Sequence, residues 1–176
     1  MKAMSTAAGS LTFADFEQLA EGTDTLELLQ GELIRVPPPK RKHMECAHRL
    51  YEALRVALES KPPRLGTPYI EMGYRIDRDT WLRPDVSVSA AGQRGDDYFE
   101  GAPALAIEIV SESNSAAEME AKTEVFLANG ASEVWLIYPK AQRAWIYRAS
   151  GSAERVEELA SPLLPNLRVP IRDLLA

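Results

Sequence analysis

The sequence predicts an α/β fold, in which helices flank a central mixed β-sheet. Two apolar runs of strand length, 104–110 and 133–138, are typical of buried strands. Two longer segments, 42–60 and 116–129, carry apolar residues at helical spacing. With several shorter strand-like runs, these segments amount to a mixed sheet with helices alongside it. A chain of 176 residues is long enough to build one domain with a substantial core.

The first half of the chain is expected to alternate short helices and strands after a disordered arm over 1–10. The predicted elements are a helix from Thr12 to Ala20, two strands within 26–36 around a turn at Gln30-Gly31, a long helix over 42–60, and strands over 68–76 and 81–88. Thr12 and Asp15 resemble a capping box at the start of the first helix. Pro84 has no N–H to donate, so its strand must lie at an edge or begin pairing after Pro84.

The second half is expected to hold the most regular elements. They are a polar loop over 90–102, a strand over 104–110, a helix from Ala116 to about Asn129, strands over 133–138 and 144–148, an extended segment over 162–170 and a terminal helical turn over 171–175. Ser115 and Glu118 form a second capping box, and Gly130 is the expected C-terminal stop of the helix. We therefore expect one domain over 11–176.

The composition indicates a soluble globular protein. Hydrophobic residues make up 45% and charged residues 26% of the chain, and no apolar run approaches the roughly 20 residues that span a membrane. Residues 1–10 lack the apolar segment of a signal peptide. The single cysteine, Cys46, excludes a disulfide framework within the chain. We expect a cytoplasmic protein with no membrane partner.

The charges are unevenly distributed along the chain. The net charge of −6 argues mildly against a dedicated nucleic-acid coat protein. Residues 35–64 nevertheless hold eight basic and three acidic side chains, whereas residues 94–133 hold two basic and nine acidic ones. This distribution suits a site that holds a cation and approaches phosphates, and it equally suits two solvated faces.

Glu108 is the most unusual residue of the sequence, because it interrupts the apolar run 104–110. A buried carboxylate needs an ion pair, hydrogen bonds or a metal, and Asp85 and Lys122 are the candidate partners. Asp85 and Glu108 lie on two candidate strands. If these strands are neighbours, the two carboxylates repel each other unless a cation lies between them, and Mg²⁺ accepts such oxygen ligands. Lys122 falls on the apolar side of its predicted helix, where it is suited to position a water and stabilise a phosphoryl transition state.

Each of these residues also has a plainer interpretation. Asp85 follows a proline and suits a turn or strand end. Glu108 can pair with Arg83 or another cation, and Lys122 can extend its ammonium to water. The three residues together, in this order, are less easily explained by accident.

A set of short motifs runs from about Thr12 to the end of the chain. The motifs are Leu28-Leu-Gln-Gly-Glu-Leu-Ile34, His43 at the start of the long helix, Arg83-Pro84-Asp85, Ala106-Ile-Glu-Ile-Val-Ser111, Ser113-Asn-Ser115, Lys122, Gly130 to Pro139 and Ser161-Pro-Leu-Leu-Pro165. Together they resemble the Uma-type restriction endonuclease family, a bacterial branch of the PD-(D/E)XK nuclease superfamily.

The resemblance implies a restriction-endonuclease-like core and a site for Mg²⁺ or Mn²⁺. In this interpretation Asp85 and Glu108 bind the metal, and Ile109 adds its carbonyl. The superfamily usually places its lysine two residues after the second acid, where this chain has Val110. Uma-type sequences carry it on the next helix, which corresponds to Lys122. A glutamate on the first core helix is also common in the superfamily. Glu45 is our first candidate for this glutamate, and Glu32 is the second.

Three hypotheses for function follow. The first is a metal-dependent endonuclease that hydrolyses phosphodiester bonds of DNA, and a homodimer fits this activity because cutting both strands needs two sites. The second is a nuclease-fold protein that only binds nucleic acid or a protein partner. The third is a small-molecule or structural α/β protein whose carboxylates are merely paired. A zinc-protease helix is excluded because His43 and His48 are five residues apart, and no phosphate-binding loop or serine-hydrolase motif is present.

Overall fold

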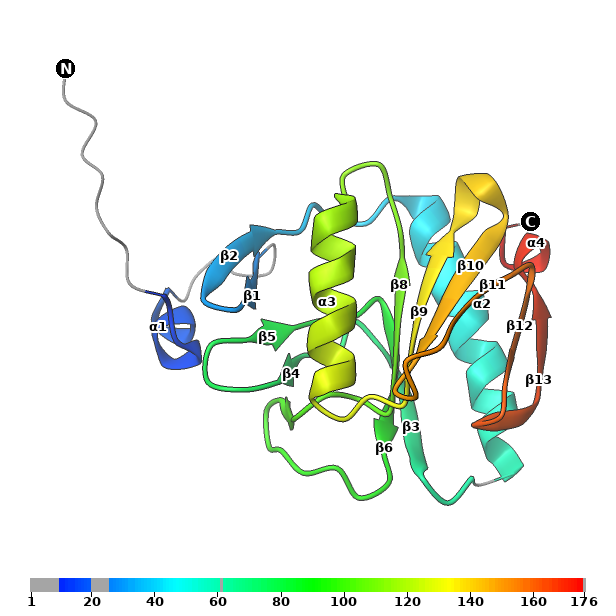
Figure 1. Ribbon diagram of the computed structural model, residues 1–176, viewed down its shortest axis with the longest axis horizontal. Helices are drawn as coiled ribbons and strands as arrows, with labels where there is room; N and C mark the ends of the chain where they lie inside the picture. The colour runs from blue at the N-terminus through cyan, green and yellow to red at the C-terminus, as the bar shows by residue number, and fades with distance from the viewer. Residues whose placement is uncertain (1–9, 20–25, 61, 176) are drawn as a thin grey trace.

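The computed structural model of the chain describes residues 10–19, 26–60 and 62–175. Within them the strands form a six-stranded, a five-stranded and a two-stranded sheet, with helices packed around the largest one (Figure 1). The predicted disordered arm lies, apart from Ser10, outside the described residues.

The six-stranded sheet is mixed, as predicted. Its strand order is β11-β10-β9-β8-β6-β3. These strands are β3 (Leu65–Ile70), β6 (Val86–Ala90), β8 (Leu105–Ile109), β9 (Glu133–Tyr138), β10 (Arg143–Arg148) and β11 (Ala153–Val156). Strands β8 and β9 are parallel, and all other neighbours are antiparallel. The two apolar runs that predicted the fold are thus the two central strands.

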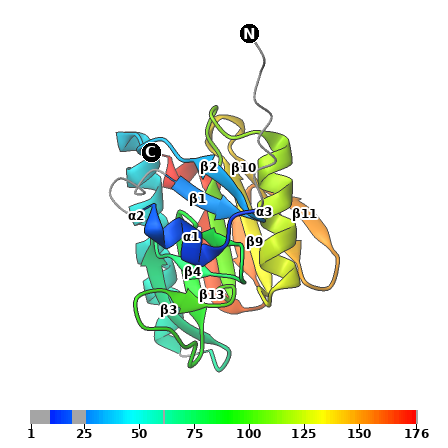
Figure 2. The same cartoon turned by 90° about the vertical axis from the view of Figure 1, so that its left-hand side faces the viewer.

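Two long helices cover opposite faces of this sheet, α2 (Arg41–Ala57) and α3 (Ala116–Ala128) (Figure 2). Alternate residues of β8 point to opposite faces, since side chains alternate along a strand. Leu105 and Ile107 pack in the same cluster as Leu50 of α2, whereas Ala106 packs in the cluster that includes Phe126 of α3. Glu108 shares the alternation of Ala106 and therefore lies on the α3 face. Helix α2 ends in a 3₁₀ turn, η2 (Leu58–Ser60).

The five-stranded sheet lies beside the first one and is built from short strands. Its order is β2-β1-β5-β4-β7, with β1 (Leu26–Leu29), β2 (Glu32–Arg35), β4 (Tyr74–Arg75), β5 (Trp81–Leu82) and β7 (Phe99–Glu100). Helix α1 (Phe13–Gln18) packs Phe13 and Phe16 against Trp81, and Thr12 caps it through the predicted capping box. Gln30 and Gly31 form the predicted β1–β2 turn with positive φ angles.

Two strand predictions were wrong in extent, because each predicted strand is divided between the two sheets. The run 68–76 splits into β3 and β4 at Glu71, whose φ of 49° interrupts the extended backbone. The run 81–88 splits into β5 and β6 around Pro84. Pairing with β3 and β8 begins at Val86, as expected after a residue without an N–H. The predicted polar loop over 90–102 also contains the short strand β7.

The C-terminal part adds elements that the sequence only partly predicted. A 3₁₀ turn, η3 (Pro139–Ala141), joins β9 to β10. Strands β12 (Glu158–Ser161) and β13 (Leu164–Pro170) form the two-stranded sheet, and α4 (Ile171–Leu174) follows. Strands β11 and β12 were not anticipated. None of the helices in the described part of the chain is long and apolar enough to cross a membrane.

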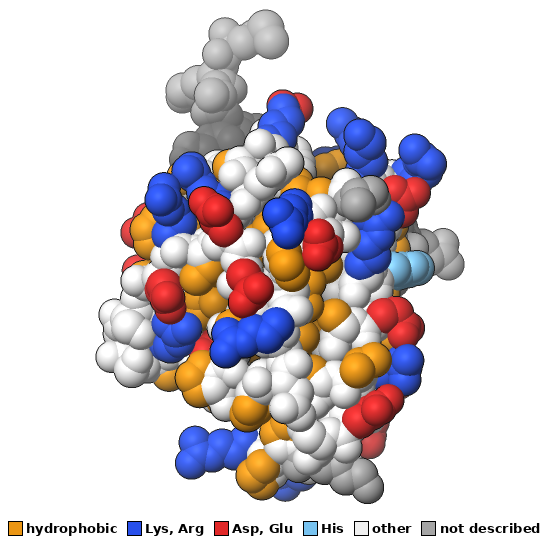
Figure 3. Space-filling view, turned by 90° about the vertical axis from the view of Figure 1, so that its right-hand side faces the viewer, with side chains coloured by type: hydrophobic (Ala, Val, Ile, Leu, Met, Phe, Trp, Pro, Cys, Tyr) orange, Lys and Arg blue, Asp and Glu red, His pale blue; other side chains and the backbone are white. Residues whose placement is uncertain are grey.

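Basic and acidic side chains are interspersed on the face that Figure 3 shows. Along α2 the charges pair with one another, as in Arg41–Glu45 and Arg55–Glu52. The basic excess of the 35–64 segment therefore does not form a continuous positive stripe along this helix.

Candidate functional site

The register of β6 and β8 places Asp85 opposite Glu108. Val86 pairs with Ile107 in this antiparallel ladder, so the next pair of positions is Asp85 and Glu108. The carboxylate Oδ2 of Asp85 accepts a hydrogen bond from the Ile109 N–H at 2.6 Å. Asp85 directly precedes β6 and Glu108 lies on the neighbouring strand β8, so the adjacency that the sequence analysis required is present.

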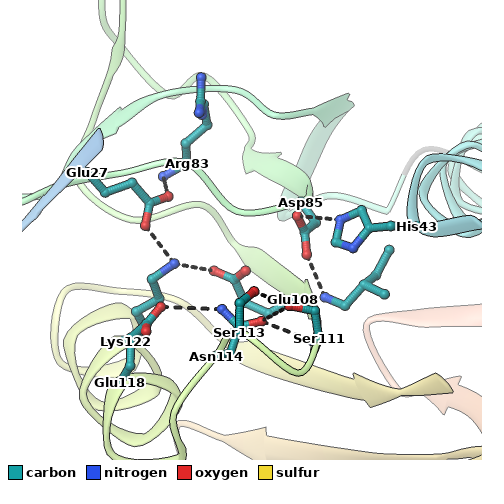
Figure 4. Close-up of polar contacts among 11 residues, drawn as sticks. Glu27, His43, Arg83, Asp85, Glu108, Ser111, Ser113, Asn114, Glu118 and Lys122 are labelled. Atoms are coloured by element: carbon teal, nitrogen blue, oxygen red, sulfur yellow. Dashed lines mark hydrogen bonds and ion pairs between the residues drawn. The ribbon is translucent and has the colours of Figure 1, made fainter. Parts of the chain in front are cut away.

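Lys122 reaches the same place from α3. Its Nζ lies 3.5 Å from Oε1 of Glu108 and 2.6 Å from Oε2 of Glu27 (Figure 4). The lysine side chain is only 4% exposed. The predicted inward orientation is therefore confirmed, and an ammonium that extends into water is excluded.

Glu27 is the residue of this cluster that our sequence analysis missed. It lies on β1, is 1% exposed, and its Oε1 accepts a hydrogen bond from the backbone N–H of Arg83 at 3.0 Å. The signal was present, because Glu27 interrupts the apolar run 26–29 in the same way that Glu108 interrupts its own strand.

His43, in the first turn of α2, was recognised in a motif but given no role. Its Nε2 lies 2.9 Å from Oδ1 of Asp85, so both oxygens of that carboxylate are held. The hydrogen bond with Asp85 raises the pKa of His43, although partial burial opposes the charged form. The imidazole thereby fixes the orientation of Asp85.

In the described part of the chain, neither of the two glutamates predicted from the superfamily forms an ion pair or hydrogen bond with Asp85, Glu108 or Lys122. Glu45 is on α2, where its half-exposed side chain pairs with Arg41 at 3.5 Å. Glu32 occupies an exposed position of β2. The third carboxylate that the structure brings to Lys122 and Glu108 is Glu27.

The loop before α3 holds the helix in the position that brings Lys122 to Glu108. Ser115 caps the helix by accepting a hydrogen bond from the Glu118 N–H, which confirms half of the predicted capping box. The Glu118 side chain instead accepts from Asn114, whose own carbonyl accepts from the Ser111 N–H (Figure 4). These bonds tie the end of β8 to the start of α3.

The electrostatics of the cluster are dominated by burial and by an excess of carboxylates. Burial raises the pKa of Glu108 to about 8, with Lys122 opposing this shift and the charges of Asp85 and Glu27 adding to it. Burial also disfavours the charged form of Lys122, but Glu108 and Glu27 together outweigh it and raise the lysine pKa. Glu27 and Glu108 both pair with Lys122, so a single ammonium serves two carboxylates when both are ionised.

This donor set fits a hard divalent cation. Mg²⁺ and Mn²⁺ prefer carboxylate and carbonyl oxygens, and Mg²⁺ commonly takes one or two carboxylates while keeping several waters. Within the described ranges no group of three or more His, Cys, Asp or Glu side chains has the arrangement of a metal site. Asp85 and Glu108 would contribute two carboxylates, and a cation between them would favour the ionised form of Glu108. The role of the Ile109 carbonyl stays a prediction.

Comparisons with known proteins bear on the family and the fold of the chain. Residues 13–172 match the model of the Uma2 family, described as "Putative restriction endonuclease". The fold is similar to the crystal structure of a putative nuclease of DUF820 from Anabaena variabilis, with a TM-score of 0.79 and 24% sequence identity over 94% of this chain and 97% of that one. This similarity confirms the predicted fold. No curated protein matches the chain. Since the family model spans nearly the whole sequence, the chain belongs to the Uma2 family of putative restriction endonucleases.

Proposed function

We propose that the chain is a metal-dependent endonuclease that hydrolyses phosphodiester bonds of DNA. The observation that carries the proposal is the pair Asp85 and Glu108, which occupy adjoining positions at the end of the β6–β8 ladder, with Glu108 beside the buried ammonium of Lys122. Membership of the Uma2 family supports the same reaction class. The most economical use of two such carboxylates is to bind a divalent cation.

In this proposal each side chain has a defined task. Asp85 and Glu108 bind Mg²⁺ or Mn²⁺, and the Ile109 carbonyl is a further candidate ligand. When bound, the cation polarises a phosphoryl oxygen and lowers the pKa of a water. Lys122 is a fixed positive charge beside Glu108, suited to stabilise the negative charge that develops on the phosphoryl group. His43 keeps the Asp85 carboxylate oriented through its Nε2.

The N-terminal end of α2 is suited to approach the DNA backbone. Lys40, Arg41 and Lys42 are exposed and directly precede His43, the residue that contacts Asp85. Arginine and lysine neutralise phosphates without reading sequence. We therefore expect backbone contacts at this end of α2, and binding that weakens as the salt concentration rises.

The test is cleavage of supercoiled plasmid DNA with Mg²⁺ or Mn²⁺. The wild type is expected to nick or linearise the plasmid, and Asp85→Asn and Glu108→Gln to reduce cleavage to background. Glu133→Gln is the matched control, because Glu133 is a buried glutamate of β9 that pairs with Arg148. It lies opposite Leu105, at the end of β8 away from Glu108. Pure wild-type protein that never nicks DNA with either metal would refute the proposal.

A second candidate function is a nuclease-fold protein that binds without cutting. The net charge of −6 favours the form of this candidate that binds a protein partner, since nucleic-acid-binding domains usually carry a basic patch. Salt-sensitive DNA binding without cleavage, unchanged by Asp85→Asn, would select this function over the first.

A further inference from the structure

Glu27 is the nearest anionic partner of Lys122. Its Oε2 lies 2.6 Å from Nζ, whereas Oε1 of Glu108 lies 3.5 Å away. Both Glu27 and Lys122 are almost fully enclosed, so water contributes little to the stability of either charge. The principal ion pair of this cluster is therefore Glu27–Lys122, and Glu108 is the more distant partner.

The second oxygen of Glu27 contacts the segment that carries Asp85. Oε1 accepts the N–H of Arg83, two residues before Asp85, and the intervening Pro84 has no N–H of its own. The carboxylate of Glu27 on β1 thus pairs with Lys122 of α3 through one oxygen. Through the other oxygen it binds the backbone of Arg83, in the segment that leads into β6 (Figure 4). It joins the five-stranded sheet to both sides of the site.

This arrangement decides how the charges of the cluster are divided. If Glu27 were neutral, the ammonium of Lys122 would have only Glu108 as its counter-ion and would compete with a cation for that carboxylate. With Glu27 ionised, the lysine charge is already matched. We propose that Glu27 is a positioning residue that takes the charge of Lys122 and leaves the carboxylates of Asp85 and Glu108 to the divalent-cation site, an inference that rests on the proposed function.

The experiment measures Mn²⁺ affinity of the full chain by calorimetry and requires no cleavage assay. Glu27→Gln is expected to weaken Mn²⁺ binding at least tenfold, because it removes one negative charge and shifts Lys122 toward Glu108. Glu27→Asp should recover part of the loss. Glu133→Gln, the same substitution at an equally buried and cation-paired glutamate, should stay within twofold of the wild type.

A double variant separates charge from folding. Glu27→Gln combined with Lys122→Met removes both members of the ion pair, so it should bind Mn²⁺ at least tenfold more tightly than Glu27→Gln alone. Wild-type binding that Glu27→Gln leaves unchanged, or a double variant as weak as the single one, would overturn the role of Glu27 and leave the proposed function intact. A wild type that binds no Mn²⁺ would overturn both.

Discussion

Replacing Lys122 by Met should destabilise the fold strongly, and more so at alkaline pH. The substitution keeps an apolar stem of similar length and removes the ammonium. It leaves the carboxylates of Glu27 and Glu108 enclosed without a cation, since the two residues are 1% and 6% exposed. Breaking a buried ion pair from one side is costly for this reason.

The magnitude follows from the distances. With an effective dielectric constant of about 20, unit charges 2.6 Å and 3.5 Å apart attract by about 6 and about 5 kcal/mol. Burial of the ions opposes this attraction by several kcal/mol for each ion. We therefore expect Lys122→Met to lower the free energy of unfolding by about 3–5 kcal/mol at pH 8.

The pH dependence has a definite sign. Buried carboxylates without a cation have raised pKa values, and burial already raises the pKa of Glu108 to about 8 when Lys122 is present. The folded variant then holds protons that the unfolded chain releases above its ordinary carboxyl pKa of about 4.5. Its stability should fall as the pH rises from about 4.5 through the raised folded pKa values, so that the loss is smallest near pH 5.

Urea unfolding of the wild type and the variant between pH 5 and pH 8.5 measures this difference. Lys140→Met is the matched control, because Lys140 is an exposed lysine paired with Glu112, and its loss should change stability by less than about 0.5 kcal/mol. A loss below about 1 kcal/mol at pH 8 for Lys122→Met, or an equal loss at pH 5 and pH 8, would refute the reasoning.

Three further predictions concern the same molecule. Mn²⁺ binding at pH 7 should release a proton from Glu108, whose pKa is about 8, so calorimetry in two buffers of different ionisation enthalpy should give different binding enthalpies; equal enthalpies would contradict this. The raised pKa of His43 means that its bond to Asp85 stabilises the fold fully below the ordinary value of 6.5, and that this contribution is lost as the pH rises through the folded pKa. Asp85→Asn should lower the His43 pKa in an NMR titration, and an unchanged value would exclude the bond as its cause. Gly130→Ala should cost about 1–2 kcal/mol in thermal unfolding, because φ is 110° there although a methyl group would meet open space; an unchanged melting temperature would contradict this.

Much of the fold could be predicted from the sequence because its strongest signals are local. The apolar runs that became β8 and β9 and the helical spacing that became α3 depend on neighbours within one element. The strands near Glu71 and Pro84 were predicted as continuous because their side chains look strand-like on both sides of the break. The position of each half in a different sheet depends on distant partners, which no local pattern contains.

The sequence by itself determined that Glu108 and Lys122 point inward, since a charge in an apolar strand or on the apolar side of a helix needs a partner there. Tertiary structure alone decided which partners these are. Glu27 meets Lys122 from another sheet, and His43 meets Asp85 across 42 positions of the chain. Contacts of this kind depend on how sheets and helices pack, and a buried charge in the sequence specifies only that a counter-charge is required, not which strand provides it.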